Sequence, residues 1–122
     1  MNKYKIRCWD GMTATVKGTT HKLILKNGEK VSVIVHRPCG SDDKYWCVSD
    51  RETGLQICGT KEYNSFICDN YFCGLDTKEQ VLLTAVSKLN VYLCENGKTF
   101  AEFKQKRLEE INYVEKGRRK NI

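Results

Sequence analysis

The sequence predicts an α+β fold in which an N-terminal antiparallel sheet of hairpins precedes helices that pack on one face. Residues 3–58 alternate apolar and polar side chains in short runs bounded by turn residues, which indicates about five or six strands. Apolar side chains recur at helical spacing in residues 60–117, which indicates two or three helices. Strands that precede helices favour a segregated sheet over alternating βαβ units.

The chain is long enough for one domain with its own core and too short for two. It has 122 residues, of which 40% are hydrophobic and 30% are charged, a balance typical of globular proteins. Pro38 is the only proline, and no Pro/Ser-rich or Gly/Ser-rich stretch offers a linker. We expect a single α+β domain over residues 1–117 and a basic C-terminal tail over residues 118–122.

The first predicted strand, residues 3–9, has one basic and one apolar face. Its odd-numbered positions hold Lys3, Lys5 and Arg7, and its even-numbered positions hold Tyr4, Ile6 and Cys8. Residues 21–37 predict a hairpin, because Asn27-Gly28 suits a primed turn and β-branched residues follow it. Residues 44–58 predict a second hairpin, in which Asp50 bonds turn amides and Gly54 takes a left-handed conformation.

Three segments predict helices. Residues 60–74 begin at Thr60 and end at Gly74, although their aromatic residues also allow a strand. Residues 76–97 place Asp76 and Glu79 at capping-box spacing and end at a glycine. Their apolar stripe comprises Val81, Leu82, Ala85, Val86, Leu89 and Leu93.

The last predicted helix occupies residues 98–117 and ends near Gly117. Thr99 and Glu102 have the spacing of a capping box at its start. Its apolar face comprises Phe100, Phe103, Leu108, Ile111 and Val114.

The chain contains seven cysteines. The N-terminal residues lack the apolar core of a signal peptide, and no run approaches the roughly 18 apolar residues that span a bilayer. We therefore expect a cytoplasmic protein without a membrane segment, whose cysteines are reduced and act mainly as small core residues.

Two chemical roles for the cysteines stay open. One conceivable zinc set comprises His36, Cys39, Cys68 and Cys73. A cysteine nucleophile would need a base, and His21 and His36 are the only histidines. Because neither arrangement has the spacing of a known site, we expect no catalytic residue, no metal and no cofactor.

Lysine and arginine outnumber aspartate and glutamate by 21 to 15, which gives a formal charge of +6. This excess favours encounter with a polyanion or an acidic protein surface. Basic residues gather in three places, and these are the candidate partner-binding residues: Lys3, Lys5, Arg7, Lys104, Lys106, Arg107, Arg118, Arg119 and Lys120. Exposed Trp9, Tyr45 or Trp46 could stack on bases. In the alternative interpretation, the lysines only solvate the surface and the aromatic residues fill the core.

Residues 46–63, WCVSDRETGLQICGTKEY, combine a tryptophan strand, a TGL turn, a second strand and a TKE helix start. This pattern resembles one in small reading frames of phages and mobile elements, which commonly encode single-domain accessory proteins, including anti-defence proteins of the anti-CRISPR type. Phe66-Ile67-Cys68 departs from the alanine-rich helix expected there. The resemblance implies a role in binding and assigns no functional residue.

These observations lead us to expect a non-enzymatic binding protein, a phage or mobile-element accessory factor that inhibits or modulates a host nucleoprotein by occupying its surface. The expected partners are a host protein or nucleoprotein, with RNA or DNA contacted through the basic surface. The alternative is a basic nucleic-acid-binding regulatory protein, and a zinc- or thiol-dependent enzyme ranks third.

The dispersed cysteines predict a native protein with no disulfide and no stoichiometric metal. Elemental analysis should find far less than one zinc per chain, and alkylation of the denatured, nonreduced protein should label all seven thiols. Intact bridges in the nonreduced protein, or a bound zinc whose chelation unfolds it, would contradict this prediction.

Overall fold

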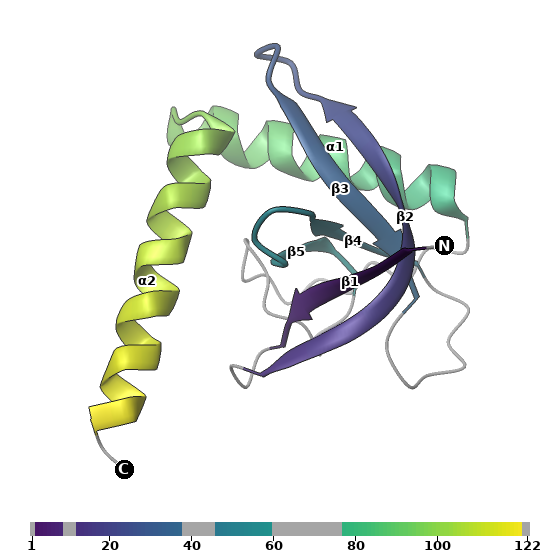
Figure 1. Cartoon of the computed structure of the whole chain (residues 1–122). Coiled ribbons are helices and arrows are strands. Elements are labelled where there is room, and N and C mark those ends of the chain that lie inside the picture. The colour runs from purple at the N-terminus through teal and green to yellow at the C-terminus, as the bar shows by residue number, and fades with distance from the viewer. Residues whose placement is uncertain (1, 9–11, 38–45, 60–76, 121–122) are drawn as a thin grey trace.

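The computed structural model describes residues 2–8, 12–37, 46–59 and 77–120, with side chains up to residue 111. Five strands precede two helices: β1 (Asn2–Arg7), β2 (Thr13–Ile24), β3 (Lys30–His36), β4 (Cys47–Asp50), β5 (Gln56–Cys58), α1 (Lys78–Asn96) and α2 (Phe100–Lys120). The predicted α+β class is confirmed (Figure 1). The predicted helix over residues 60–74 lies outside the described residues.

The strands form one antiparallel sheet in the order β1-β2-β3-β4-β5, so every strand pairs with its neighbours in sequence. Both predicted hairpins are present: β2 pairs with β3, and β4 pairs with β5. The register places Lys3 opposite Lys17 in β1 and β2, and His21 opposite Val33 in β2 and β3. This register decides which side chains share the basic face of β1.

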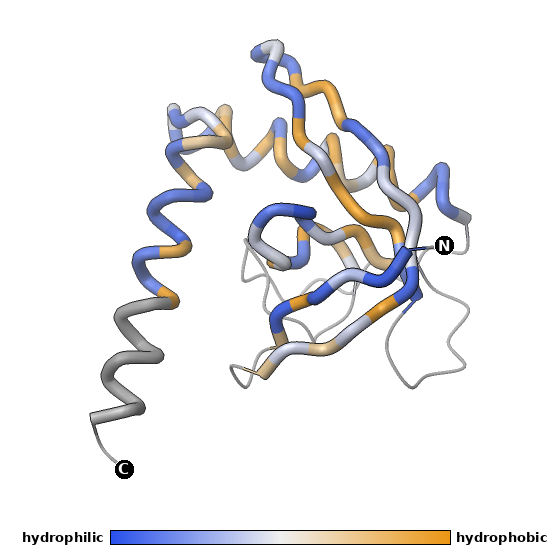
Figure 2. The backbone as a smooth tube through the Cα atoms, viewed as in Figure 1, coloured by the Kyte–Doolittle hydropathy of each residue, from blue (hydrophilic) through white to orange (hydrophobic). Residues whose placement is uncertain are grey.

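The main apolar core lies between the sheet and the helices. The sheet contributes Val33 and Val35 from β3 and Val48 from β4. The helices contribute the buried residues Val81, Ala85, Leu89, Leu93, Phe100, Phe103 and Ile111. Figure 2 shows the apolar residues concentrated along β3 and recurring along α1. Helix α1 therefore packs on one face of the sheet, as predicted, and α2 joins the same core through Phe100, Phe103 and Ile111.

A second apolar cluster lies on the opposite face of the sheet. Ile6, Val16, Ile34 and Cys47 are buried there, and Ile6 and Ile34 are fully buried. No described helix contributes to this cluster. Curvature brings β1 over β3 and β4, and Gly18 allows it, because a Cβ at that position would lie 2.6 Å from the Ile34 side chain.

The two ends of the sheet meet at the β4–β5 turn. The backbone amide of Arg7 donates to the carbonyl of Gly54 over 2.9 Å, which joins β1 to this turn. Gly54 has φ of +74°, and an added Cβ would lie 3.0 Å from the carbonyl oxygen of Lys5. Asp50 holds the turn, as predicted, by accepting from the backbone amide and the hydroxyl of Thr53. The sheet thus curls around its second cluster, and the Arg7 end of its edge strand β1 is bonded to the β4–β5 turn.

The β2–β3 turn differs from the predicted primed turn. Among the described residues only glycines have positive φ, so Asn27 does not take the conformation that a type I′ turn requires. Gly28 has φ of +89°, its amide donates to the carbonyl of Leu25, and the Leu25 amide donates to the carbonyl of Glu29. This pattern is that of a type I turn followed by a left-handed glycine in a G1 bulge. The Asn27 side chain instead accepts from the Glu29 amide.

The ends of α1 carry regular caps. Thr77 is its N-cap and accepts from the amide of Gln80, so the predicted start at Asp76 is wrong by one residue. A threonine hydroxyl fits this position as well as an aspartate does. At the other end the amides of Gly97 and Lys98 donate to the carbonyls of Cys94 and Leu93, which is a Schellman motif.

Helix α2 begins at the predicted capping box, in which the Glu102 amide donates to the Thr99 hydroxyl and the Glu102 carboxylate accepts from the Thr99 amide. Glu29 adds a cap from the β2–β3 turn by accepting from the amides of Phe100 and Ala101. Burial favours a raised Glu29 pKa, but these hydrogen bonds outweigh it and lower the pKa. The helix continues past Gly117 to Lys120, so its predicted end near Gly117 is wrong.

Replacing Gly28 by valine should destabilise the protein by about 1 kcal/mol or more, because a β-branched residue resists positive φ. A Cβ at this position meets no atom within 4 Å, so the cost would be that of the backbone alone. Urea unfolding of Gly28→Val measures it. Gly28→Asn is the matched control and should cost less, since asparagine tolerates the left-handed region. Equal stability of the valine variant and the wild type would contradict the assigned turn.

Candidate functional site

The outward face of β1 and of the part of β2 paired with it carries basic residues and threonines and no acidic residue. Lys3 and Lys5 are exposed on β1, and Lys17 is exposed on β2 directly opposite Lys3. Neither strand contains an aspartate or a glutamate, and these three lysines form no salt bridge with the described residues. Like charges directly opposite each other destabilise a strand pair. The sheet therefore carries a charge arrangement that packing alone does not favour.

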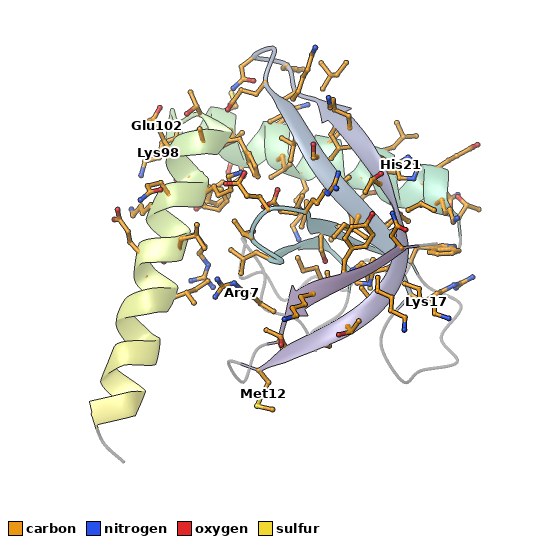
Figure 3. All side chains as sticks on the ribbon, in the orientation of Figure 1. Arg7, Met12, Lys17, His21, Lys98 and Glu102 are labelled. Atoms are coloured by element: carbon orange, nitrogen blue, oxygen red, sulfur yellow. The ribbon has the colours of Figure 1, made fainter. Side chains whose placement is uncertain are left out.

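Arg7 has a structural role in addition to its charge. Its Nε–H donates to the carbonyl of Thr53 over 2.9 Å, next to the amide bond that closes the sheet. Figure 3 shows Arg7 and Lys17 at opposite ends of the β1–β2 ladder. Of the predicted basic set on β1, Lys3 and Lys5 are therefore the residues whose charges face outward.

A hollow of about 460 Å³ opens between β1 and the β4–β5 turn. Its walls include Tyr4, Lys5 and Arg7 from β1 and Arg51 and Glu52 from the turn. The Arg51 guanidinium carbon lies 5.8 Å from the centre of the Tyr4 ring, a cation–π contact. Arg51 is exposed, so its charge lies at the mouth of the hollow.

The basic residues of α2 divide into two groups. Lys104 forms a 2.7 Å salt bridge with Glu52 of the β4–β5 turn, and Arg107 forms a 3.3 Å bridge with Glu110. Lys106 is exposed on the same helix. The backbone of Arg118, Arg119 and Lys120 belongs to α2, and their side chains lie outside the described set. The structure therefore brings Lys104, and not the end of the helix, close to the hollow.

Trp46 lies at the edge of the main core. Its ring is half-buried against that core, and two cations lie over it, Arg37 at 3.9 Å and Lys78 at 4.7 Å from the ring centre. This tryptophan already has cationic partners from α1 and from the residue that follows β3, which favours a packing role over a free base-stacking platform. Trp9 and Tyr45 lie outside the described residues.

The two histidines each contact a hydroxyl group. His36 is fully buried, with Nε2 at 2.9 Å from the Ser49 hydroxyl and Nδ1 at 3.0 Å from the Arg37 carbonyl. A proton on Nδ1 would donate to the carbonyl and leave Nε2 to accept from serine. Burial lowers the His36 pKa, although the hydrogen bond to Arg37 opposes this. A pair that no solvent reaches stabilises the sheet and offers no nucleophile to a substrate.

His21 lies half-buried on β2, with its Nε2 at 3.0 Å from the Thr19 hydroxyl. No carboxylate of the described residues hydrogen-bonds to this ring. An activated hydroxyl nucleophile needs a base that a third group orients. The Thr19–His21 pair therefore lacks that part of a catalytic set within the described chain.

The described cysteines occupy different surroundings. Cys47 is buried in the second cluster, Cys58 is buried in the main core, Cys8 is half-buried and Cys94 is exposed. Cys39, Cys68 and Cys73 of the candidate zinc set lie outside the described residues, and His36 is engaged with Ser49. Within the part of the chain that the structure describes, no three His, Cys, Asp or Glu residues group to hold a metal.

Sequence reasoning missed Lys17 and Arg51 as neighbours of β1. The alternation of β1 predicted its lysine face, but Lys17 joins that face only through the β1–β2 register. Arg51 contacts Tyr4, on the opposite face of β1, only through the curl of the sheet, which no local pattern encodes. A search for basic residues in the strand after a predicted turn would have suggested Lys17 alone.

Comparison with known proteins gives no similarity to reason from: no family model matches the chain, and no curated protein or solved structure does either. In the described residues, neither α1 nor α2 is long and apolar enough to cross a membrane.

The buried His36 predicts a loss of stability in mild acid. Because its pKa is lowered in the folded state, the unfolded state takes up the proton first, so stability is full above about pH 6.5 and declines as the pH falls below it. Replacing His36 by glutamine should reduce the difference in unfolding free energy between about pH 7 and about pH 5. Urea unfolding at both pH values measures this difference. An unchanged difference in the His36 variant would refute the assignment.

Proposed function

We propose that the chain is a non-enzymatic binding protein whose basic β1–β2 face contacts an anionic surface of a nucleoprotein. In this proposal it acts as an accessory factor of a phage or mobile element, of the anti-defence type, and modulates its target by occupying that surface. The observation that carries the proposal is the outward set Lys3, Lys5 and Lys17. These charges lie together without a carboxylate neighbour in either strand.

The energetics support a contact surface better than a purely solvating one. A Lys3–Lys17 cross-strand pair costs stability in the isolated protein, whereas an anionic partner would convert the repulsion into attraction. Exposed charges of this kind mainly accelerate encounter with the partner, and salt screens them. The enzyme alternative has weaker support, since the buried His36–Ser49 pair is closed to a substrate.

The second candidate function is a regulatory protein that binds nucleic acid directly. The hollow beside β1 favours it, because Tyr4 and Arg51 place an aromatic ring and a cation next to the lysine face. The two candidates differ in what the basic face meets first. In the first, this face meets the surface of an assembled nucleoprotein; in the second, it meets the phosphate backbone of nucleic acid alone.

Capture from a bacterial lysate tests the proposal and separates the two candidates. The tagged wild-type chain should retain a specific partner, and nuclease treatment should abolish the capture only if nucleic acid bridges it. Reversing Lys3, Lys5 and Lys17 to glutamate should remove the partner, because the contact surface loses its charge. Mass spectrometry of the eluted proteins provides the measurement.

A second triple variant serves as the matched control. Lys22, Lys26 and Lys30 are exposed around the far end of the β2–β3 hairpin, and their reversal to glutamate produces the same change in formal charge. This variant should retain the partner if the β1–β2 face is the contact. Equal loss of capture in both triple variants, with both proteins folded, would show attraction by net charge alone and refute the proposal.

A further inference from the structure

We infer that the hollow between β1 and the β4–β5 turn binds single-stranded nucleic acid, with a backbone phosphate between Lys5 and Arg51 beside the ring of Tyr4. This inference rests on the proposed function, because it assigns the nucleic-acid part of the nucleoprotein target to one site beside β1, lined by Lys5 of the basic face and by Tyr4 of the opposite face. It adds Tyr4 and Arg51 to the binding residues. It also specifies single-stranded nucleic acid and not a duplex as the ligand.

The charges that line the hollow favour an anion. Among the described residues that line it, Lys5, Arg7 and Arg51 are cationic and Glu52 is acidic. Lys104 neutralises this carboxylate through the 2.7 Å salt bridge. Neither Lys5 nor Arg51 forms an ion pair with the described residues, so both charges can approach a phosphate.

The shape and surroundings of the hollow favour a nucleotide unit. Its volume of about 460 Å³ lies within the range of small-molecule sites, roughly 300 to 1,000 Å³. Arg51 presents a planar guanidinium over the Tyr4 ring, and bases stack on both arginine planes and aromatic rings. A base reaches such a concave wall only when it is unpaired, which excludes a regular duplex from this contact.

The site is held by the same bonds that close the sheet. The Arg7–Gly54 and Arg7–Thr53 hydrogen bonds fix β1 against the turn that carries Arg51. Asp50 is buried and caps that turn through Thr53, so the backbone before Arg51 is constrained. Lys5 and Arg51 are therefore held on constrained backbone. They are 46 residues apart in the sequence, the same separation as the hydrogen-bonded pair Arg7 and Thr53.

Fluorescence anisotropy with a labelled oligothymidine of about 12 nucleotides tests the inference on the whole chain. The wild type should bind at low salt. Arg51→Gln and Lys5→Gln should each weaken binding by about tenfold and reduce the slope of log K against log salt by about 0.7, the value for one single-strand phosphate contact. Lys22→Gln, which removes an exposed charge elsewhere on β2, should keep wild-type binding and slope.

Competitors distinguish the sources of the phosphate. Unlabelled oligothymidine should displace the probe, whereas a hairpin duplex, inorganic pyrophosphate and a poly-glutamate peptide at equal charge should not. Displacement by pyrophosphate would show that the site binds free phosphate and not a nucleic-acid strand. Displacement by poly-glutamate would show that any negative charge binds there. Either result overturns the inference. Equal weakening by all three glutamine variants also overturns it, provided that their melting temperatures match the wild type.

Failure of this inference differs from failure of the proposed function. Absence of oligonucleotide binding, with capture of a nuclease-resistant partner that still depends on Lys3, Lys5 and Lys17, overturns the inference alone. Loss of that dependence in the capture experiment overturns the proposed function. Tyr4→Phe should bind the probe as the wild type does, because the ring and not the hydroxyl forms the contact with Arg51.

Discussion

The hydrogen bond from the Arg7 amide to the Gly54 carbonyl joins the first strand to the last turn of the sheet. A five-stranded antiparallel ribbon without this contact would leave Ile6 and Ile34 open to water on the face that no described helix covers. Closing the curl buries both side chains completely. The same closure brings Tyr4 close to Arg51. The second core and the hollow therefore depend on the contact of β1 with this turn, which the Arg7 amide and the Arg7 side chain both make.

The features that sequence predicted well are those that local spacing determines. Alternation along residues 3–9 assigned Ile6 to the interior and Lys5 to solvent. Thr99 with Glu102 marked the start of α2. Both predictions succeeded because strand pleat and helix capping depend on residues only a few positions apart. The curl was not predictable, since its bonds use backbone groups that every residue possesses. The turn at Gly28 was misassigned because asparagine-glycine suits two hairpin geometries, and only the pairing register chooses between them.

The basic residues of this protein have two physical roles, which composition cannot separate. Arg7, Lys104 and Arg107 are bonded to groups within the chain, where they hold the strand, the turn and the helix. Lys3, Lys5 and Lys17 share a strand face without carboxylates, and their mutual repulsion is relieved only by solvent or by an external anion. Substituting the first group would test folding, and substituting the second group would test binding.

The position of β1 at the edge of the sheet gives its lysines another consequence. An edge strand exposes backbone donors and acceptors to which the edge of a second molecule can add, and alternating lysines oppose this by bringing like charges together. The charges that attract a partner therefore also keep two copies of the chain from extending each other's sheets. A partner that neutralises Lys3 and Lys5 removes this protection while it is bound, so crowding many copies onto one long polyanion is the condition under which the chain would be most prone to assemble edge to edge.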